Sequence, residues 1–167
     1  MSAPLTQTQL PSESILDIFG KQNYLGNSFI LPNPGTTLTD ETEDPAIVIS
    51  NPAGSGKSLF VFNKKFTTDN NNVLVRFYFN PVQNVAGSTT TPINVRTGAT
   101  QKSVSRCYLS STITSNGTYV AIIPAISLLI STDLLYIVDQ GNSLLITGQQ
   151  VGMGTTTLYS EIAWYEI

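Results

Sequence analysis

The sequence of 167 residues contains no histidine, which removes the side chain that most often acts as a general base or a metal ligand. Its single cysteine, Cys107, excludes an intrachain disulfide and a thiolate metal site. Only 11% of the residues are charged, less than half the usual share, and the net charge is −3. Because so weak a charge does not favour a polyanion, we expect no nucleic-acid partner.

One apolar run, from Tyr119 to Val138, is about as long as a membrane span. Pro124 and Asp133 interrupt it and β-branched residues are frequent, so we expect two strands joined by a short connection. The first residues, MSAPLTQTQLPSES, have neither a basic start nor an apolar stretch. We therefore expect no secretion signal and no membrane partner.

Residues 1–45 differ from the rest and are expected to form an N-terminal arm. The arm carries one short helix, at about residues 12–19, which Ser12 caps and Gly20 ends. After the helix, proline and glycine recur too often for a long strand, and the acidic run TDETED is expected to be a solvated loop. Two alternatives remain: the arm lies over its own domain, or it reaches a neighbouring subunit.

Residues 46–167 show the pattern of a β-domain, with short alternating runs between turns rich in Gly, Asn, Asp and Pro. We expect no helix in this domain. The predicted fold is all-β, a single antiparallel β-sandwich, and the unequal connections favour jelly-roll or Greek-key topology. The predicted strands are Ile47–Ser50, Ser58–Phe66, Val73–Phe79, Ile93–Arg96, Val104–Ser111, Tyr119–Ile123, Leu134–Val138, Ser143–Thr147 and Thr157–Tyr165.

The segment NPAGSGKS, beginning at Asn51, ends like a phosphate-binding loop, and LLYIVD, ending at Asp139, resembles the metal-binding strand that accompanies such a loop. Asn51, however, replaces the first glycine of the motif, and the following SLFVFNKKF has the residues of a strand where a phosphate site needs a helix. We therefore expect a strand-to-strand turn in which Pro52 fixes φ and Gly54 and Gly56 have positive φ. No cofactor is expected.

The acidic residues offer little for catalysis or metal binding. Nothing in their spacing places two of them at a catalytic separation, and TDETED lacks the ligand spacing and central glycine of a calcium loop. An enzyme is the least favoured class, and we expect no catalytic residue and no metal ligand. The carboxylates that could supply a catalytic pair are Asp133, Asp139, Glu161 and Glu166.

Four stretches resemble small single-domain β-sandwich proteins of virus particles, especially those of tailed bacteriophages: DPAIVISNPAGSGKSLFVF, VLVRFYFNP, LYIVDQGNSLLITG and the terminal IAWYE. The resemblance covers roughly residues 44–167 and rests on turn chemistry. It implies a virion structural component, such as a capsid decoration (cement) protein, a head-fibre base or a tail-fibre module. Because such proteins often form trimers, it also implies a homotrimer.

The first functional hypothesis is a capsid decoration protein that binds the capsid surface as an oligomer and stabilises the shell. The arm would contact the major capsid protein or neighbouring subunits through its apolar side chains, so that deleting residues 1–30 abolishes assembly and leaves the sandwich folded. These anchors are Leu5, Leu10, Ile15, Leu16, Phe19, Tyr24, Leu25 and Phe29.

The alternative hypothesis is a carbohydrate- or receptor-binding module of a viral tail fibre or head fibre, with its ligand on exposed loops or on one sheet face. Four aromatic residues could stack on sugars, but the same rings could instead lie in the core or in oligomer contacts. They are Tyr78, Tyr108, Tyr159 and Trp164.

Overall fold

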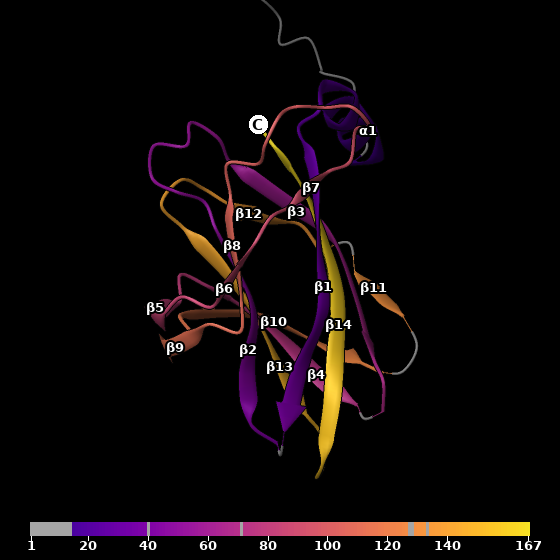
Figure 1. The fold of residues 1–167 in the computed structure, drawn as a ribbon, viewed down its shortest axis with the longest axis vertical. Coiled ribbons are helices and arrows are strands. Elements are labelled where there is room, and N and C mark those ends of the chain that lie inside the picture. The colour runs from indigo at the N-terminus through magenta and orange to yellow at the C-terminus, as the bar shows by residue number, and fades with distance from the viewer. Residues whose placement is uncertain (1–14, 40, 71, 127–128, 133) are drawn as a thin grey trace, which may run out of the picture.

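The computed structural model describes residues 15–39, 41–70, 72–126, 129–132 and 134–167. These residues form two antiparallel six-stranded sheets packed together, with a two-stranded ribbon and one helix outside them (Figure 1). The predicted all-β antiparallel sandwich is confirmed.

Each sheet is built from strands that come from both halves of the chain. The first sheet contains β1 (Ser28–Thr39), β3 (Leu59–Thr68), β7 (Ile93–Asn94), β11 (Ile130–Thr132), β12 (Tyr136–Val138) and β14 (Thr155–Glu166). The second contains β2 (Glu43–Ser50), β4 (Val73–Phe79), β6 (Ser88–Thr90), β8 (Arg106–Leu109), β10 (Thr118–Ala125) and β13 (Ser143–Gln150). The ribbon pairs β5 (Val82–Val85) with β9 (Thr112–Ser115), and helix α1 (Ile15–Leu25) precedes β1.

The strand order is that of a jelly roll. The first sheet runs β11–β3–β14–β1–β7, with β12 also paired to β3, and the second runs β10–β4–β13–β2–β8–β6. Consecutive strands β1 and β2, β3 and β4, β10 and β11, and β13 and β14 therefore lie in opposite sheets, as two Greek keys require. Strands β5 to β9 form an insertion between β4 and β10, which we call the β5–β9 insertion.

The inner faces of the two sheets enclose one hydrophobic core. The alternation predicted for β4 is observed, since Val73, Val75 and Phe77 all point into this core. Trp164 of β14 packs against Phe29 of β1 with ring centroids 6.2 Å apart, and both side chains are fully buried. Burying each large apolar side chain stabilises the fold by roughly 1.5–3 kcal/mol, so these residues hold the two sheets together.

Strand β1 corrects the prediction of an extended arm for residues 28–39. It pairs with β14 from Ser28 opposite Tyr165 to Thr39 opposite Thr155, so it is an integral strand of the first sheet. The expectation that proline and glycine prevent a long strand is wrong, because a bulge between Asn33 and Thr36 absorbs the irregular residues. The Asn33 side chain stabilises this bulge through hydrogen bonds with the Thr36 hydroxyl and a backbone amide.

Helix α1 continues through Gly20 to Leu25, so the prediction that Gly20 ends the helix is wrong. The residue that follows, Gly26, has φ of 77° and closes the helix instead. Residues 12–14 of the predicted helix lie outside the described residues. Ile18 of α1 packs on a buried cluster of the first sheet that includes Phe62 and Tyr165, so the described part of the helix lies over its own domain.

The described residues of the apolar run from Tyr119 to Val138 form strands, as expected, although there are three of them (β10, β11 and β12) and not two. In the described part of the chain, no helix combines the length and the hydrophobicity that crossing a bilayer requires. The prediction of a solvated acidic loop is wrong for Glu43 and Asp44, which begin β2.

Candidate functional site

The loop that resembles a phosphate site is a turn between β2 and β3. Gly54 (φ 77°) and Gly56 (φ 72°) have the predicted positive φ, and the backbone that follows is the extended strand β3. Asn51 is buried, and its Nδ2 donates hydrogen bonds to the carbonyl oxygens of Lys57 at 2.8 Å and Val138 at 2.9 Å. The residue that breaks the glycine motif therefore attaches the turn to β12.

The groups that would hold phosphate and magnesium in a nucleotide site bind other parts of this chain. The backbone amide of Ser58 donates to the carbonyl oxygen of Ile167 at 2.8 Å, and its hydroxyl donates to Asp139 Oδ1 at 2.7 Å. Lys57 Nζ lies 3.8 Å from Glu166 Oε2. These contacts give the Gly-Lys-Ser sequence a structural role.

Glu166 is a fully buried carboxylate at the end of β14. Its Oε1 accepts hydrogen bonds from Trp164 Nε1 at 3.3 Å, from the backbone amide of Val104 at 3.1 Å and from the hydroxyl of Ser103. Several hydrogen bonds to a carboxylate offset much of the cost of removing its charge from water. Glu166 thereby attaches the β5–β9 insertion to the last strand of the sandwich.

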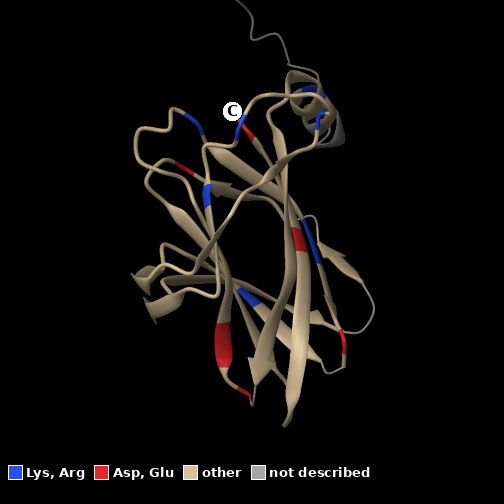
Figure 2. Cartoon of the chain, viewed as in Figure 1, with Lys and Arg blue, Asp and Glu red and all other residues tan. Residues whose placement is uncertain are grey.

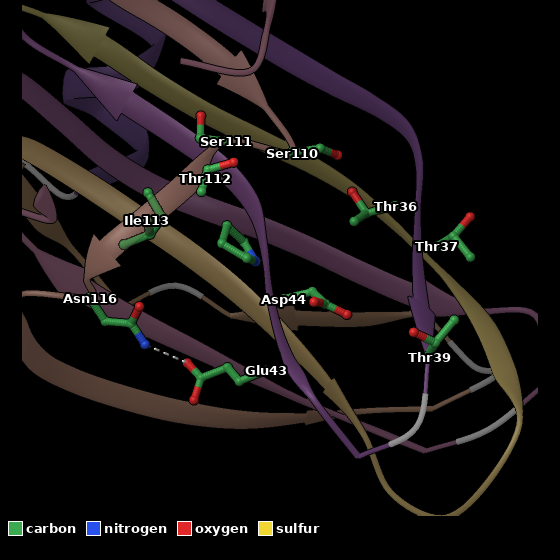
Figure 3. Close-up of a pocket in the computed structure, with 11 residues that line it drawn as sticks. Thr36, Thr37, Thr39, Glu43, Asp44, Ser110, Ser111, Thr112, Ile113 and Asn116 are labelled. Atoms are coloured by element: carbon green, nitrogen blue, oxygen red, sulfur yellow. Dashed lines mark hydrogen bonds between the residues drawn. The ribbon is translucent and has the colours of Figure 1, made fainter. Parts of the chain in front are cut away.

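A polar cleft of about 500 Å³ opens where β1 ends, β2 begins and the β5–β9 insertion leads back to β10 (Figure 3). Two stretches far apart in the sequence supply its walls: the end of β1 with the start of β2, and residues 110–116. Six of its lining residues carry hydroxyl groups: Thr36, Thr37, Thr39, Ser110, Ser111 and Thr112. We call this feature the hydroxyl cleft.

The two carboxylates of the hydroxyl cleft differ in their surroundings. Glu43 is satisfied within the protein: its Oε1 accepts from Thr147 Oγ1 at 2.6 Å and from Asn116 Nδ2 at 3.3 Å, and its Oε2 lies 3.4 Å from Arg76 NH1. Partial burial raises the pKa of Asp44 above its ordinary value of 3.8, although a hydrogen bond from the Thr39 backbone opposes this shift. Among the described residues that line the cleft, none is Lys or Arg.

A second surface lies along one side of the sandwich, where both sheets end. The edge strand of the second sheet is β10, and the edge strands of the first sheet on this side are β11 and β12. Five large apolar residues on or next to β10 and β12 are between 41% and 53% exposed: Tyr119, Ile122, Leu134, Leu135 and Ile137. We call this surface the open edge.

The open edge carries little charge. In the sequence from Thr118 to Val138 the only charged residue is Asp133, which lies outside the described residues. In Figure 2 no part of the β10 and β12 ribbons has the colour of an acidic or a basic residue. Thr118 of β10 and Ile137 of β12 line one shallow hollow, so the edges of the two sheets lie next to each other there.

The predicted anchors of the arm are not brought together in one surface. Tyr24 and Leu25, at the end of α1, are 76% and 49% exposed and are available for a partner. Phe29 is fully buried in the core, and its predicted contact with a neighbour is corrected to packing within its own domain. Leu5 and Leu10 lie outside the described residues, as do the side chains of Ile15, Leu16 and Phe19.

The aromatic residues considered for sugar stacking are mostly internal. Trp164 is fully buried and Tyr78 is 9% exposed, which agrees with the core interpretation for these two. Tyr108 is half-buried against the outer face of the second sheet. Only Tyr159, at 39%, counts as exposed.

Sequence reasoning missed the hydroxyl cleft because its walls are about 70 residues apart along the chain. The available signal is the Thr-rich end of β1, which follows proline and glycine and precedes an acidic run, but the same residues are also typical of a loop. Among the described residues, no group of three or more His, Cys, Asp or Glu side chains is placed to hold a metal ion.

Comparisons with family models, with curated proteins and with solved structures found no match to this chain. The resemblance to virion proteins therefore stays a prediction.

Proposed function

We propose that this protein is a virion structural protein of the capsid decoration (cement) type, which associates as a homo-oligomer, with a trimer favoured, and stabilises a viral shell by binding the major capsid protein. The observation that carries the proposal is the open edge: exposed apolar residues along two edge strands, with no charged side chain among its described residues. Apolar surface of this kind commonly marks a protein–protein interface.

The open edge is suited to association through side chains. An unprotected edge strand can pair with another chain by extending its sheet. In β10, Pro124 lacks an amide donor, and a bulge between Tyr119 and Ala121 interrupts the pairing register. These features oppose sheet extension and leave Ile122, Leu135 and Ile137 to be buried against a second copy.

The assignment to a virus particle is supported by the turn sequences around Asn51 and Asp139, by the jelly-roll connectivity and by the weakly charged surface. The exposed end of α1, with Tyr24 and Leu25, supplies a contact for the capsid that is separate from the open edge. Arg96 lies over the Tyr24 ring, 5.5 Å from its centroid, and steadies that side chain.

The proposal is tested by measuring the molar mass of the full chain with light scattering after size exclusion. We expect an oligomer, and we expect Leu135→Glu with Ile137→Glu to convert it to a folded monomer, because burying two carboxylates in an apolar interface is unfavourable. Val151→Glu, at a residue that is also half exposed but lies outside the open edge, is the matched control and should leave the oligomer intact.

A monomeric wild-type chain at micromolar concentration would contradict the assembly proposal. A genome in which the coding sequence lies beside that of a tail fibre, and far from that of a major capsid protein, would contradict the capsid assignment.

A carbohydrate- or receptor-binding module of a viral fibre is the second candidate function. The hydroxyl cleft favours it, because neutral polar groups are concentrated there in one concave surface.

A further inference from the structure

We infer that the hydroxyl cleft is a binding site for a neutral saccharide. Serine and threonine hydroxyls both donate and accept hydrogen bonds, which matches the mixed donor and acceptor character of sugar hydroxyls. Two stretches of the chain, residues 36–39 and 110–112, bring six such groups to one cleft, and Figure 3 shows Thr36 across the cleft from Ser110 and Thr112.

The charges of the cleft favour a neutral ligand over an anion. None of the described lining residues is cationic, and Asp44 contributes a negative charge. The negative charge of Glu43 is paired with Arg76, so its carboxylate already has a partner within the chain. Asp44 is partly shielded from water, and a hydrogen bond accepted there from a ligand hydroxyl is stronger than one at a fully hydrated carboxylate.

The cleft also offers an apolar surface. Pro45 and Ile113 are among its lining residues, and Ile113 packs against the cluster of Val48, Tyr78 and Leu145 on the outer face of the second sheet. Sugar rings present C–H groups beside their hydroxyls, so a wall of this mixed composition contacts both. The volume of about 500 Å³ lies within the range of roughly 300–1,000 Å³ found for small-molecule sites.

The wall formed by the β5–β9 insertion is held in place by its own hydrogen bonds. Ser111 Oγ accepts from the backbone amide of Gly87 and from Gln83 Nε2, both at 3.0 Å. Ser110 has a positive φ of 52°, a conformation that a residue other than glycine keeps only when its surroundings enforce it. The cleft is therefore preformed, which lowers the entropic cost of binding.

This site is independent of the proposed assembly. None of the described residues that line the cleft belongs to β10, β11 or β12, so the open edge can associate while the cleft stays accessible.

The test is a glycan array probed with the full chain, followed by titration of the neutral sugar that binds into ¹⁵N-labelled protein. We expect a neutral glycan to bind and to shift the amide signals of Asp44, Ser110 and Thr112. Thr37→Val and Thr112→Val keep the β-branched shape and remove one hydroxyl from each wall. Each should weaken binding by about 2- to 12-fold, the effect of losing one neutral hydrogen bond.

Thr89→Val is the matched control, because Thr89 is an exposed threonine of β6 that lines a different hollow. It should leave the affinity unchanged, and the dispersed spectrum of each variant should show that it is folded. Three outcomes would overturn the inference: an array with no binder or with only sulfated or sialylated binders, an affinity that neither cleft variant reduces, or calcium chloride alone reproducing the amide shifts.

Discussion

The hydroxyl of Ser58 donates a hydrogen bond to Asp139 Oδ1 at 2.7 Å, and this bond joins the start of β3 to the turn after β12. In a nucleotide-binding fold the corresponding hydroxyl and carboxylate serve a magnesium ion. Here the two groups bind each other, so the sequence features that resemble a nucleotide site connect two strands of one sheet.

Replacing Ser58 with alanine should lower the free energy of unfolding by about 0.5–1 kcal/mol, because the lost hydrogen bond is exposed to solvent. Urea denaturation measures this change. We also expect Mg-ATP to leave the melting temperature of the wild type unchanged. A rise in melting temperature with Mg-ATP that disappears in Lys57→Ala would show that the loop binds nucleotide after all.

The buried carboxylate of Glu166 should be far more sensitive to substitution than an exposed one. Glu166→Gln replaces one acceptor oxygen with a donor group facing the amide of Val104, and should destabilise the fold by about 1.5–3 kcal/mol. Glu161→Gln, in the same strand, breaks a half-exposed 2.8 Å ion pair with Lys65 and should cost at most about 1 kcal/mol. Equal losses in urea denaturation would refute the structural role of Glu166.

Strand β1 changes what a truncation experiment should show. Deleting residues 1–30, as the sequence suggested, removes Ser28, Phe29 and Ile30 from β1. We expect a chain starting at Asn27 to fold and one starting at Asp40 to fail, because the second lacks β1, one of the two strands that pair with β14. Circular dichroism and the one-dimensional proton spectrum distinguish the two.

Phe29→Ala tests the same point without truncation. It should lower the free energy of unfolding by about 3–5 kcal/mol, since it leaves a cavity beside Trp164. An effect below about 1 kcal/mol would instead agree with an arm that is only loosely attached.

The central strands were predictable because their signal is local. In Val73–Phe79 the side chains alternate between the two faces of the strand, and the residues from Val73 to Phe77 are alternately buried and half-exposed. The positive φ values of the turn follow from having glycine at positions 54 and 56. The β-forming residues after Ser58 predict the extended strand β3, and therefore predict that the turn is not a phosphate site.

The errors arose where distant contacts override local preference. Gly20 costs about 1 kcal/mol relative to alanine within a helix, but the packing of α1 on the first sheet outweighs that preference. Proline and glycine near Asn33 suggested a loop, whereas the bulge there lets β1 keep its pairing with β14.

The short strands β5, β6 and β9 carry mostly exposed residues, so they lack the apolar alternation that would reveal them. The hydroxyl cleft exists only once β1 and residues 110–116 are placed beside each other.

The carboxylate of Asp69 should make stability fall in acid. Its Oδ1 accepts hydrogen bonds from the Thr157 amide and the Thr156 hydroxyl, both at 2.8 Å, and these bonds, the amide first, lower its pKa below 3.8. A lowered folded-state pKa gives stability that is present above pH 3.8 and is lost as pH falls through the folded value.

Asp69→Asn should therefore be less stable than the wild type at neutral pH, and the difference in melting temperature should shrink as the pH falls from about 5 to 2. Differential scanning fluorimetry across this range measures it. A constant difference would mean that the charge of Asp69 contributes nothing.

Cys107 should be unreactive in the folded protein. Burial raises the pKa of its thiol to about 12, so the thiolate is scarce at pH 8, and the side chain is only 1% exposed. Ellman's reagent should detect no thiol in the native protein and one thiol per chain in concentrated urea. Rapid reaction under native conditions would contradict the described burial.

The two Greek keys are built from β1–β4 and β10–β14, and residues 80–117 leave them after β4 and return at β10. Residues 110–116 of this stretch form one wall of the hydroxyl cleft, and the lining residues of β1 and β2 form the other. Substitutions confined to the exposed residues of that stretch would therefore change what the cleft recognises, whereas Cys107 in the core and Val104 beside Glu166 are needed for the fold itself.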